Sequence, residues 1–429
     1  MNSLKIARLG EVSGRVTLPG SKSLSNRALL CAALSEGRTA VLNLLRSDDT
    51  ARMMDALKAL GTKITERGTA CEVEGLGHAF DTGLNRVTLD LGNAGTAMRP
   101  LCAALSFSNG SFALTGTKRM FERPIGPLCE ALRSLGVHID YLNNPGFPPV
   151  LIRGCQAPKS HEASIDGQLS SQFITALLLA APLAGGLEIR VRGELISKPY
   201  VDLTVKLMER FGVKVSRKGY SEFAIPEGAR YKSPGSCLIE GDATAATYFA
   251  AAAAIAGKVE IYGIPEDSVQ GDAAFLSVLE RMGAKVTRLE HSVVVERQGR
   301  LKGIDIDMNA MPDAAMTLVP MALYTDGPVT IRNIASWRVK ETDRIAAMAR
   351  EMGKLGVKVE SGEDFISVDA ARRNSEIPAF DTYDDHRMAM CLSLCAFDRD
   401  IVVNDPQCVA KTFPGYFKEL AAVTRKAPS

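Results

Sequence analysis

Apolar and polar positions follow one pattern that occurs five times along the chain. In each copy a helix-like run ends in Gly, and residues that favour a β-strand follow directly. Glycine suits the left-handed position that closes a helix, and β-branched residues favour strands. The copies are LKALGTKI around Gly61, LRSLGVHI around Gly136, MERFGVKV around Gly212, LERMGAKV around Gly283 and GKLGVKV around Gly356. The pattern therefore predicts five transitions from helix to strand.

A second series of positions marks helix starts at a similar period. The motif CAAL at 31–34 recurs at 102–105, and a third apolar helix is expected to begin near Phe173. Asp242, Asp313 and Asp385 each open a stretch rich in Ala or Met. Successive glycines of the first series lie 75, 76, 71 and 73 residues apart, and the three aspartates lie 71 and 72 apart. Two series with one period predict six α/β units of about 70 residues, each with two helices and several short strands.

The sixth unit lacks its glycine. Its last helix is expected at 414–423, near the C-terminus, so a strand at 5–8 is expected to complete this unit. The two chain ends would then lie in one domain, formed by 1–20 plus 241–429, and 21–240 would form the other. Each domain would hold three repeats.

Length and composition are those of an ordinary globular protein. At roughly 150 residues per domain, a chain of 429 residues should form two or three domains. Apolar residues make up 46% and charged residues 23%, which excludes disordered and fibrous classes. The 51 basic and 49 acidic residues balance to a formal charge of +2. Because a nucleic-acid-binding protein usually carries a larger basic excess or a basic block, we expect no such partner.

Other features bear on location and metal content. The longest apolar runs, 173–184 and 248–256, are too short to span a bilayer. Charged residues such as Lys5 and Arg8 lie where a secretory signal would have its apolar segment, so we expect no such signal. The nine cysteines are scattered and form no CxxC pair, so we expect buried free thiols in a reducing cytoplasm. Five histidines, none three or four residues from another, make a metal site improbable. We expect no cofactor and a cytoplasmic protein without membrane contact.

The predicted helix starts carry small and polar residues. They are GSKS at 20–23, GNAGT at 92–96, GQLSSQ at 167–172, GDAT at 241–244, PDAA at 312–315 and DDHR at 384–387. Unpaired N–H groups and the helix dipole make such starts anion sites, although plain capping by Ser, Asn, Thr or Asp explains any one of them. The first is no Walker A loop, since GxxxxGK[ST] is not satisfied.

Cationic side chains accompany these starts. The eight that lie beside a helix start or a turn are Lys22, Arg27, Arg99, Arg123, Lys340, Arg344, Arg387 and Lys411. Arg offers forked recognition of phosphate or carboxylate, and Lys offers a compact charge. If both domains face one cleft, these cations would bind a substrate pair with several anionic groups, and the empty, self-repelling cleft would be open until anions close it.

The segment RVKETDR at 338–344 is the densest of these charged stretches. If it is helical, Lys340 and Arg344 share a face and Glu341 lies beside them. The alternative is a surface ladder of ion pairs.

At these residues the chain closely resembles the 5-enolpyruvylshikimate-3-phosphate synthase family, the enolpyruvyl transferases of the shikimate pathway. The matching motifs are LPGSKSLSNRALL, LGNAGTAMRP, RPIG, SSQF, SKPY, PDAAMT, RVKETDR, DDHRMAM and AKTFP, and they run from Leu18 to Pro414. The resemblance implies an α/β fold of two similar domains, each with three βαβαββ-type repeats in an inside-out α/β barrel, and an active site in the cleft between them. It also implies transfer of the enolpyruvyl group of phosphoenolpyruvate to shikimate 3-phosphate, with release of phosphate.

The resemblance further implies two sets of binding residues. For shikimate 3-phosphate they are Lys22, Ser23, Arg27, Ser170, Ser171, Gln172, Ser197, Tyr200, Asp313, Ser336 and Lys340. For phosphoenolpyruvate they are Lys22, Asn93, Gly95, Thr96, Arg99, Arg123, Gln172, Glu341, Arg344, His386, Arg387 and Lys411. Ser336 departs from the family, which often has Asn at this place, so one substrate hydrogen bond is in question.

The chemistry requires a base at the attacking 5-hydroxyl and an acid at the methylene carbon. Asp313 is the expected acceptor of the hydroxyl proton, Glu341 the expected donor to the methylene, and Lys22 an acid or charge stabiliser near the bridging oxygen. Phosphate would leave with its charge held by Lys and Arg and with no metal.

Two other functions compete with this one. The same-fold UDP-N-acetylglucosamine enolpyruvyl transferases generally carry Cys or Asp five residues before the Arg of their RP motif, where this chain has Lys118. A non-catalytic binder of a phosphorylated metabolite would keep the cations, but Asp313 and Glu341 would then only weaken anion binding.

Gly95, Thr96 and Pro100 resemble the pattern sensitive to glyphosate, the family's phosphoenolpyruvate-competing inhibitor. We expect a monomer.

Overall fold

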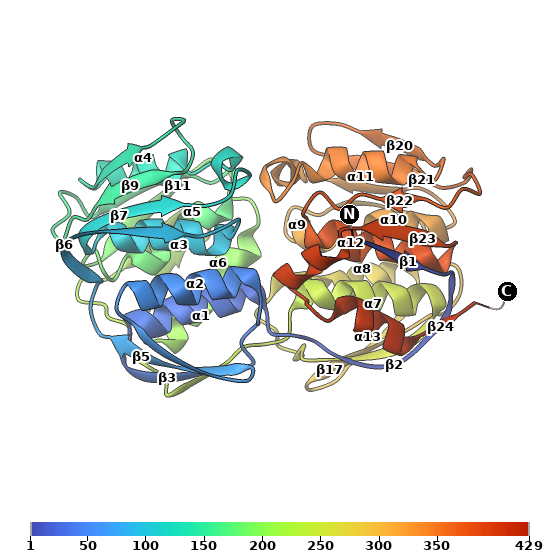
Figure 1. Cartoon of the computed structure of the whole chain (residues 1–429), viewed down its shortest axis with the longest axis horizontal. Helices are drawn as coiled ribbons and strands as arrows, with labels where there is room; N and C mark the ends of the chain where they lie inside the picture. The colour runs from blue at the N-terminus through green and yellow to red at the C-terminus, as the bar shows by residue number, and fades with distance from the viewer. Residues whose placement is uncertain (1, 428–429) are drawn as a thin grey trace. The chain divides into compact units, whose positions relative to one another are not determined.

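The chain folds into two compact units. The computed structural model describes residues 2–427. One unit, here the central unit, comprises residues 20–239, and the other, the terminal unit, comprises residues 1–19 and 240–429. Figure 1 shows that the terminal unit contains both ends of the chain.

The central unit is made of three repeats. The first contains α1 (Lys22–Leu34), β3 (Glu36–Leu42), α2 (Asp48–Ala59), β4 (Lys63–Arg67), β5 (Ala70–Leu76) and, from the end of the unit, β14 (Ser236–Leu238). The second contains β6 (Asp81–Asp90), α3 (Gly95–Ser106), β7 (Asn109–Thr115), the short 3-10 helix η1 (Met120–Glu122), α4 (Gly126–Ser134), β8 (His138–Tyr141) and β9 (Val150–Arg153). The third contains β10 (Glu162–Asp166), α5 (Ser171–Ala180), β11 (Leu187–Arg192), α6 (Lys198–Arg210), β12 (Ser216–Lys218) and β13 (Glu222–Ile225).

The terminal unit repeats this order. Its first repeat contains β2 (Leu9–Thr17), α7 (Ala243–Ala256), β15 (Gly257–Tyr262), η2 (Gly271–Ala274), α8 (Phe275–Met282), β16 (Lys285–Arg288) and β17 (Ser292–Glu296). The second contains β18 (Ile304–Asp307), α9 (Pro312–Ala315), α10 (Leu318–Met321), η3 (Ala322–Tyr324), β19 (Val329–Arg332), η4 (Ala335–Val339), α11 (Arg344–Gly353), β20 (Lys358–Ser361) and β21 (Ile366–Asp369). The third contains β22 (Ala379–Phe380), α12 (His386–Leu392), η5 (Ser393–Phe397), β23 (Ile401–Asn404), η6 (Pro406–Lys411), α13 (Tyr416–Val423), β24 (Thr424–Lys426) and β1 (Ser3–Ile6).

Five of the six sheets within residues 2–427 share one topology. In the sheet β6-β7-β9-β8, for example, β6 and β7 are parallel, and β9 and β8 then continue antiparallel. The sheets β10-β11-β13-β12, β14-β3-β5-β4 and β18-β19-β21-β20 repeat this arrangement, and β2-β15-β17-β16 does so with β24 added at one edge. The βαβαββ order that the family resemblance implies is thus confirmed.

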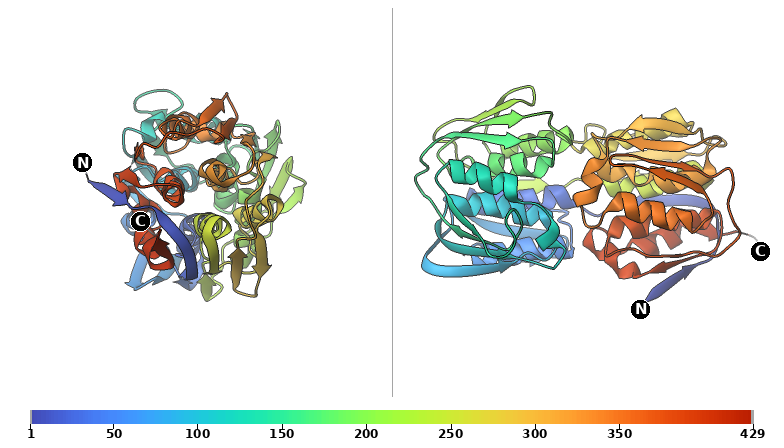
Figure 2. Two further views of the ribbon diagram at one scale, coloured as in Figure 1. Left: turned by 90° about the vertical axis from the view of Figure 1, so that its right-hand side faces the viewer. Right: turned by 90° about the horizontal axis from the view of Figure 1, so that it is seen from above.

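The sixth sheet is completed by the start of the chain. β1 pairs antiparallel with β23, which itself pairs in parallel with β22. Figure 2 shows this N-terminal strand, in blue, beside C-terminal segments in red. The structure confirms that a strand near residue 5 completes the last unit, although it spans Ser3–Ile6, and α13 begins at Tyr416 rather than at 414.

The glycines that end the second helix in five of the six repeats explain the period. Gly61 and Gly136 have φ angles of 95° and 97°, and Gly283 has 103°. Gly212 and Gly356 also have positive φ angles, of 81° and 71°. Because only glycine adopts this conformation without steric cost, it recurs at the end of these five helices.

The first helix of each repeat is the buried element. Twelve of the thirteen residues of α1 and thirteen of the fourteen of α7 are buried, and apart from the polar start of α1 the side chains are mostly apolar or small on every side. The strands are buried on one face only, as in β5, and Figure 1 shows them outside the helices of each unit. The sheets therefore surround a helical core, which is the predicted inside-out arrangement. None of the helices in residues 2–427 has the length and apolar character needed to cross a membrane.

Candidate active site

Arg344 is the centre of a buried charge network in the terminal unit. It is the first residue of α11, and its side chain is 1% exposed. Its Nη1 lies 2.9 Å from Asp313 Oδ1, and its Nη2 lies 2.9 Å from Glu341 Oε2. Its Nε donates to Asp385 Oδ2 at 2.8 Å. One guanidinium thus holds three carboxylates that come from three different segments of the chain.

Asp313 is the most heavily paired of these carboxylates. Besides Arg344, Arg387 Nη2 lies 3.0 Å from its Oδ2 and Lys340 Nζ lies 3.2 Å from its Oδ1. Burial alone would raise the pKa of Asp313, but the charges of Arg387, Lys340 and Arg344 outweigh burial and hold the pKa well below its usual range. Asp313 is therefore an ionised group.

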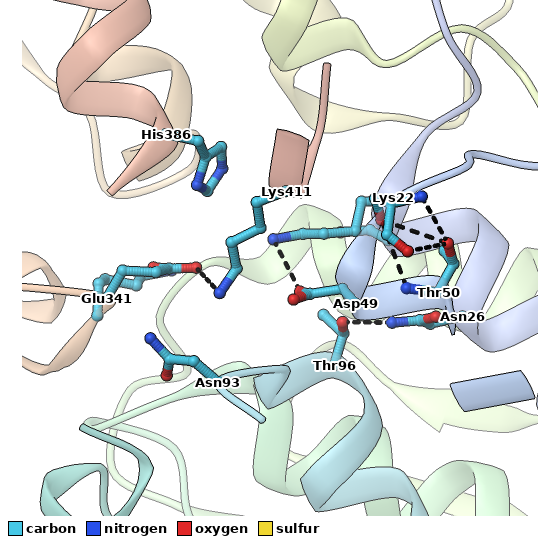
Figure 3. Close-up of polar contacts among 12 residues, drawn as sticks. Lys22, Asn26, Asp49, Thr50, Asn93, Thr96, Glu341, His386 and Lys411 are labelled. Carbon is cyan, nitrogen blue, oxygen red and sulfur yellow. Dashed lines mark hydrogen bonds and ion pairs between the residues drawn. The ribbon is translucent and has the colours of Figure 1, made fainter. Parts of the chain in front are cut away.

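Glu341 lies between two cations. It is 8% exposed, and Lys411 Nζ lies 3.8 Å from its Oε1, opposite the contact with Arg344. Figure 3 shows Lys411 at the end of η6 extending to Glu341, with His386 nearby in the same unit. His386 is completely buried, and its Nδ1 lies 3.6 Å from Asp385 Oδ1. The predicted residues Glu341, His386 and Lys411 are thus neighbours in the fold.

The helix considered for residues 338–344 is not formed. The 3-10 helix η4 ends at Val339, and α11 begins at Arg344 with Asp343 as its N-cap. Lys340 and Arg344 meet at Asp313 and not through helical spacing. The surface-ladder alternative is also wrong for Arg344, since Arg344 is buried. Ser336 lies within η4 and is half-buried, beside the fully buried Trp337, whose Nε1 donates to Pro312 O at 2.7 Å.

Lys22 begins α1 in the central unit. Its Nζ lies 3.4 Å from Asp49 Oδ2, and both side chains are less than 10% exposed. Asp49 lies in the first turn of α2, where Ser47 and Thr50 form a reciprocal capping box. Figure 3 shows this lysine reaching the start of α2. α2 thus holds the lysine with a fixed carboxylate.

Gly95 lies against two guanidinium groups. A methyl group at Gly95 would lie 2.6 Å from Arg99 Nη1 and 2.8 Å from Arg123 Nη2. Arg99 is 3% exposed and donates to Pro124 O at 2.9 Å. Arg123 is 4% exposed, donates to Asn93 Oδ1 at 2.9 Å, and its Nε has no hydrogen-bond partner within residues 2–427. The backbone of the loop before α3 therefore lies beside two buried guanidinium groups, those of Arg99 and Arg123.

Thr96 and Arg27 connect this loop to the other helix starts. Asn26 Nδ2 donates to Thr96 Oγ1 at 2.7 Å, as Figure 3 shows. Arg27 is buried, donates from Nε to Thr204 Oγ1 at 2.9 Å and from Nη1 to Ser23 O at 3.0 Å. Burial lowers the pKa of Arg27 to about 10.

The remaining predicted residues of the central unit lie at the starts of two further helices. Ser171 and Gln172 open α5, and Ser197 precedes α6, which contains Tyr200. α6 packs against both α1 and α5. Three helix starts of the central unit thus carry the residues assigned to shikimate 3-phosphate.

Side-chain caps occupy half of the predicted helix starts. Ser170 Oγ accepts from Gln172 N at 3.2 Å, Asp242 caps α7 and Asp385 caps α12, so plain capping is correct for these three. The starts of α1, α3 and α9 carry no side-chain cap hydrogen bond. At α1 and α3, therefore, the anion-site interpretation persists.

Several residues that position the site were missed by the sequence reasoning. Asp49 holds Lys22, Asp385 holds Arg344, and Thr204 holds Arg27. Tyr248 on α7 accepts from Arg387 Nη1 at 3.2 Å. Only Asp385 gave a signal in the sequence, through its place in the aspartate series. Within residues 2–427 no cluster of His, Cys, Asp and Glu side chains is arranged to hold a metal ion.

A buried acid next to this network makes the stability of the protein depend on pH. Asp272 in η2 accepts from the hydroxyl of Thr244 and is 6% exposed. Burial, followed by the charge of Asp313, raises the pKa of Asp272 from 3.8 to about 7. Because the folded state keeps this proton while the unfolded state loses it, the protein loses stability as pH rises from about 4 to about 7.

We expect Asp272→Asn to increase the free energy of unfolding, and to do so more at pH 8 than at pH 5. A neutral amide resembles the protonated acid, and the pKa shift caps the gain at about 4 kcal/mol. Urea unfolding at both pH values measures this, with the exposed Asp267→Asn as the control. An equal effect of Asp272→Asn at both pH values would show that the acid does not titrate in the folded state.

The chain is similar to known proteins both in sequence and in fold. A model of the family EPSP synthase (3-phosphoshikimate 1-carboxyvinyltransferase) matches residues 6–420. The 3-phosphoshikimate 1-carboxyvinyltransferase of Tolumonas auensis is 51% identical over 430 residues, which cover 99% of this chain and 100% of that protein. The protein of the same description from Vibrio vulnificus is 52% identical over 434 residues and covers 100% of both. The solved EPSP synthase from Acinetobacter baumannii has a similar fold, with a TM-score of 0.81 at 24% identity over 99% of this chain and 98% of that chain.

Proposed function

Because the chain belongs to the EPSP synthase (3-phosphoshikimate 1-carboxyvinyltransferase) family, we propose that Asp313 and Glu341 transfer the protons of its reaction and that Lys22 acts as an acid or charge stabiliser near the bridging oxygen. The enzyme transfers the enolpyruvyl group of phosphoenolpyruvate to the 5-hydroxyl of shikimate 3-phosphate and releases phosphate. The reaction passes through a tetrahedral intermediate and belongs to the shikimate pathway of aromatic amino acid biosynthesis. The observation that carries the proposed roles is the single arginine, Arg344, that holds Asp313, Glu341 and Asp385 together in the buried network.

The two substrates are assigned to different sets of side chains. We assign shikimate 3-phosphate to the starts of α1, α5 and α6 and to Asp313, Ser336 and Lys340. Phosphoenolpyruvate is assigned to Lys22, to the loop before α3 with Arg99 and Arg123, to Gln172, and to Glu341, Arg344, His386, Arg387 and Lys411. Its carboxylate and phosphate suit the forked geometry of guanidinium groups. The buried Arg123 Nε, which has no partner within residues 2–427, supports an anion at that place.

The ion pairs of Asp313 suggest how the base becomes active. With three cations around it, Asp313 has a low pKa and is a weak base. Anionic substrate groups would compete for Arg344 and Arg387, and each contact withdrawn from Asp313 raises its pKa toward the ordinary range. Asp313 would then accept the proton of the 5-hydroxyl at the moment when both substrates are bound.

The same charges favour proton donation by Glu341. In the ligand-free protein, Arg344 and Lys411 stabilise its carboxylate. The negative charges of phosphoenolpyruvate would raise its pKa, because like charges disfavour ionisation. A protonated Glu341 would then supply the methylene proton, while Lys22 stabilises the charge on the bridging oxygen.

A phosphate-release assay tests the acceptor and the donor together. We expect phosphate from phosphoenolpyruvate when shikimate 3-phosphate is present, and none when UDP-N-acetylglucosamine replaces it. Binding of both ligands without phosphate would indicate a non-catalytic binder. Phosphate with the UDP-sugar alone would assign the chain to the other enolpyruvyl transfer reaction.

Inhibition by glyphosate is part of the proposal. A methyl group at Gly95 would narrow the space between Arg99 and Arg123. One guanidinium nitrogen of each arginine would lie less than 3 Å from the added carbon. We expect Gly95→Ala to raise the glyphosate inhibition constant at least tenfold more than KM for phosphoenolpyruvate, a difference of about 1.4 kcal/mol. Gly353→Ala, whose methyl meets nothing within 4 Å, is the control. Equal inhibition of Gly95→Ala and the unaltered enzyme would disprove this placement of the inhibitor.

We also propose that the enzyme acts as a cytoplasmic monomer with domains 1–20 plus 241–429 and 21–240. A reducing cytoplasm suits its nine free cysteines, seven of them buried. Light scattering during gel filtration measures the mass of the particle, and a dimer would exclude the monomer.

A further inference from the structure

The loop that carries Asp385 and Arg387 begins with two residues in an unfavourable conformation. Tyr383 and Asp384 have φ angles of 56° and 54°, both in the left-handed region. Each residue with a side chain in this conformation costs of order 1 kcal/mol or more unless surrounding contacts hold it there. The next residue, Asp385, caps α12 through Arg387 N at 3.0 Å and accepts from Arg344 Nε at 2.8 Å. The strained pair thus directly precedes the proposed phosphoenolpyruvate-binding residues.

A buried carboxylate outside the reaction site contacts this loop. Glu351 lies on α11 with a fully buried side chain. Its Oε1 accepts from the hydroxyl of Tyr383 at 2.7 Å, and its Oε2 accepts from Asp381 N at 2.9 Å. Lys354 Nζ lies 2.7 Å from the same Oε2 and balances the charge. The carboxylate is therefore fully satisfied, and two of its three bonds end in the loop.

The Tyr383 hydroxyl is suited to this role as a donor. Burial and the hydrogen bond to Glu351 raise the pKa of Tyr383 to about 12, so its hydroxyl keeps the proton that it donates. Lys354 also donates to Ala379 O at 2.7 Å and pairs with Asp381 at 3.0 Å. The stretch before the strained pair is thus held on the same helix.

α11 therefore contacts the loop at two separate points. Arg344 and Glu351 are seven residues apart and share one face of the helix, about 10 Å apart along its axis. Arg344 binds the loop at Asp385, and Glu351 binds it at Asp381 and Tyr383. A segment of five residues held at both ends by one rigid helix has little freedom to relax its left-handed residues.

We propose that Glu351 and Tyr383 form a clamp that holds residues 383–384 in the left-handed conformation and thereby positions Asp385 and Arg387 for phosphoenolpyruvate. The inference rests on the proposed function, because it takes Arg344 and Arg387 as ligands of that substrate. Glu351 and Tyr383 act as positioning residues through the loop. Without the clamp the loop relaxes, and the two guanidinium groups lose their preset geometry.

The variant Tyr383→Phe tests the clamp, because it deletes one hydroxyl and keeps the ring. We expect KM for phosphoenolpyruvate to rise about tenfold, equal to about 1.4 kcal/mol. KM for shikimate 3-phosphate should stay unchanged, and kcat should change less than threefold. Tyr324→Phe is the matched control, since the hydroxyl of Tyr324 also donates within the terminal unit, to Leu394 O at 2.7 Å, outside this loop. Equal changes in both KM values, or no change in either, would overturn the clamp.

A second variant separates positioning from a general loss of structure. Glycine adopts the left-handed conformation without cost, so Asp384→Gly in the Tyr383→Phe background should restore at least half of the lost phosphoenolpyruvate affinity. Absence of any recovery would contradict the role of the strained pair. If Tyr383→Phe does not fold, Glu351→Gln with and without Asp384→Gly is measured instead, with the same expectations.

A failure of the clamp can be told from a failure of the proposed site. Arg387→Lys removes the forked contact itself and should raise KM for phosphoenolpyruvate whatever the clamp does. If Arg387→Lys raises KM and Tyr383→Phe does not, the clamp is wrong and the site stands. If neither variant changes KM, the assignment of Arg387 is wrong, and the clamp falls with it.

Discussion

Glu341→Gln is expected to lower kcat by a factor of about 10² to 10⁴, the usual contribution of a positioned general acid. The amide keeps the size of the side chain and can still accept from Arg344, whose Nη2 lies 2.9 Å from Glu341 Oε2. It cannot deliver a proton to the methylene carbon. Steady-state phosphate release at saturating concentrations of both substrates measures the loss.

The effect of this variant on KM distinguishes a proton donor from a group that only balances charge. Neutralising Glu341 leaves Arg344 and Lys411 with less negative charge between them, so an anionic substrate should bind at least as tightly as before. A lower KM for phosphoenolpyruvate with an unchanged kcat would therefore reduce Glu341 to a counter-ion. Glu290→Gln, at a side chain that is 88% exposed, is the control for the substitution itself.

The repeats could be predicted from the sequence because a local conformation sets their period. The second helix of five repeats ends at a left-handed residue, and glycine fills that position at Gly61, Gly136, Gly212, Gly283 and Gly356. The sixth repeat could not be recognised by this signal, because α13 ends without such a glycine and β24 follows it directly. The N-terminal strand of its sheet could nevertheless be predicted, because the last helix lies so near the C-terminus that the unit needs a strand from the start of the chain.

The site could be predicted only in part, because half of each ion pair is distant in sequence. Positive charges beside helix starts are visible along the chain, and Lys22, Arg123 and Arg344 are all buried in the fold. Two of the three carboxylates that pair with Arg344 lie 31 and 41 residues away, in other segments of the same unit. No local pattern relates such positions.

The segment 338–344 shows how a local pattern can mislead. Charges spaced four apart favour a helix, but Asp343 caps α11 and so ends the possibility of a helix through it. Arg338 instead donates from Nε to Glu363 O at 2.8 Å and pairs with Asp343 at 2.8 Å. Helix capping and tertiary contacts thus decide the local structure here, and not the spacing of the charges. Lys340 and Arg344 contact Asp313 without lying on one helix.

Arg344→Met is expected to destabilise the protein by about 3 to 5 kcal/mol, as breaking buried ion pairs does when one partner is removed. Asp313, Glu341 and Asp385 would then face one another without the guanidinium that separates them. Urea unfolding measures the loss. The control is Arg332→Met, which removes the two 2.7 Å bonds of an exposed pair with Asp305 and should cost less than about 1 kcal/mol.

The pH dependence of this variant identifies the cause of the destabilisation. In the unaltered protein, the low pKa of Asp313 contributes stability that is present above the unfolded pKa of 3.8 and lost as pH falls below it. Without Arg344, Asp313 loses one of the three cations that lower its pKa, so the variant takes up a proton at higher pH than the unaltered protein does. The difference in unfolding free energy between the two should therefore shrink from pH 8 to pH 5. A difference that is the same at both pH values would mean that lost packing of the arginine stem, and not uncompensated charge, accounts for the effect.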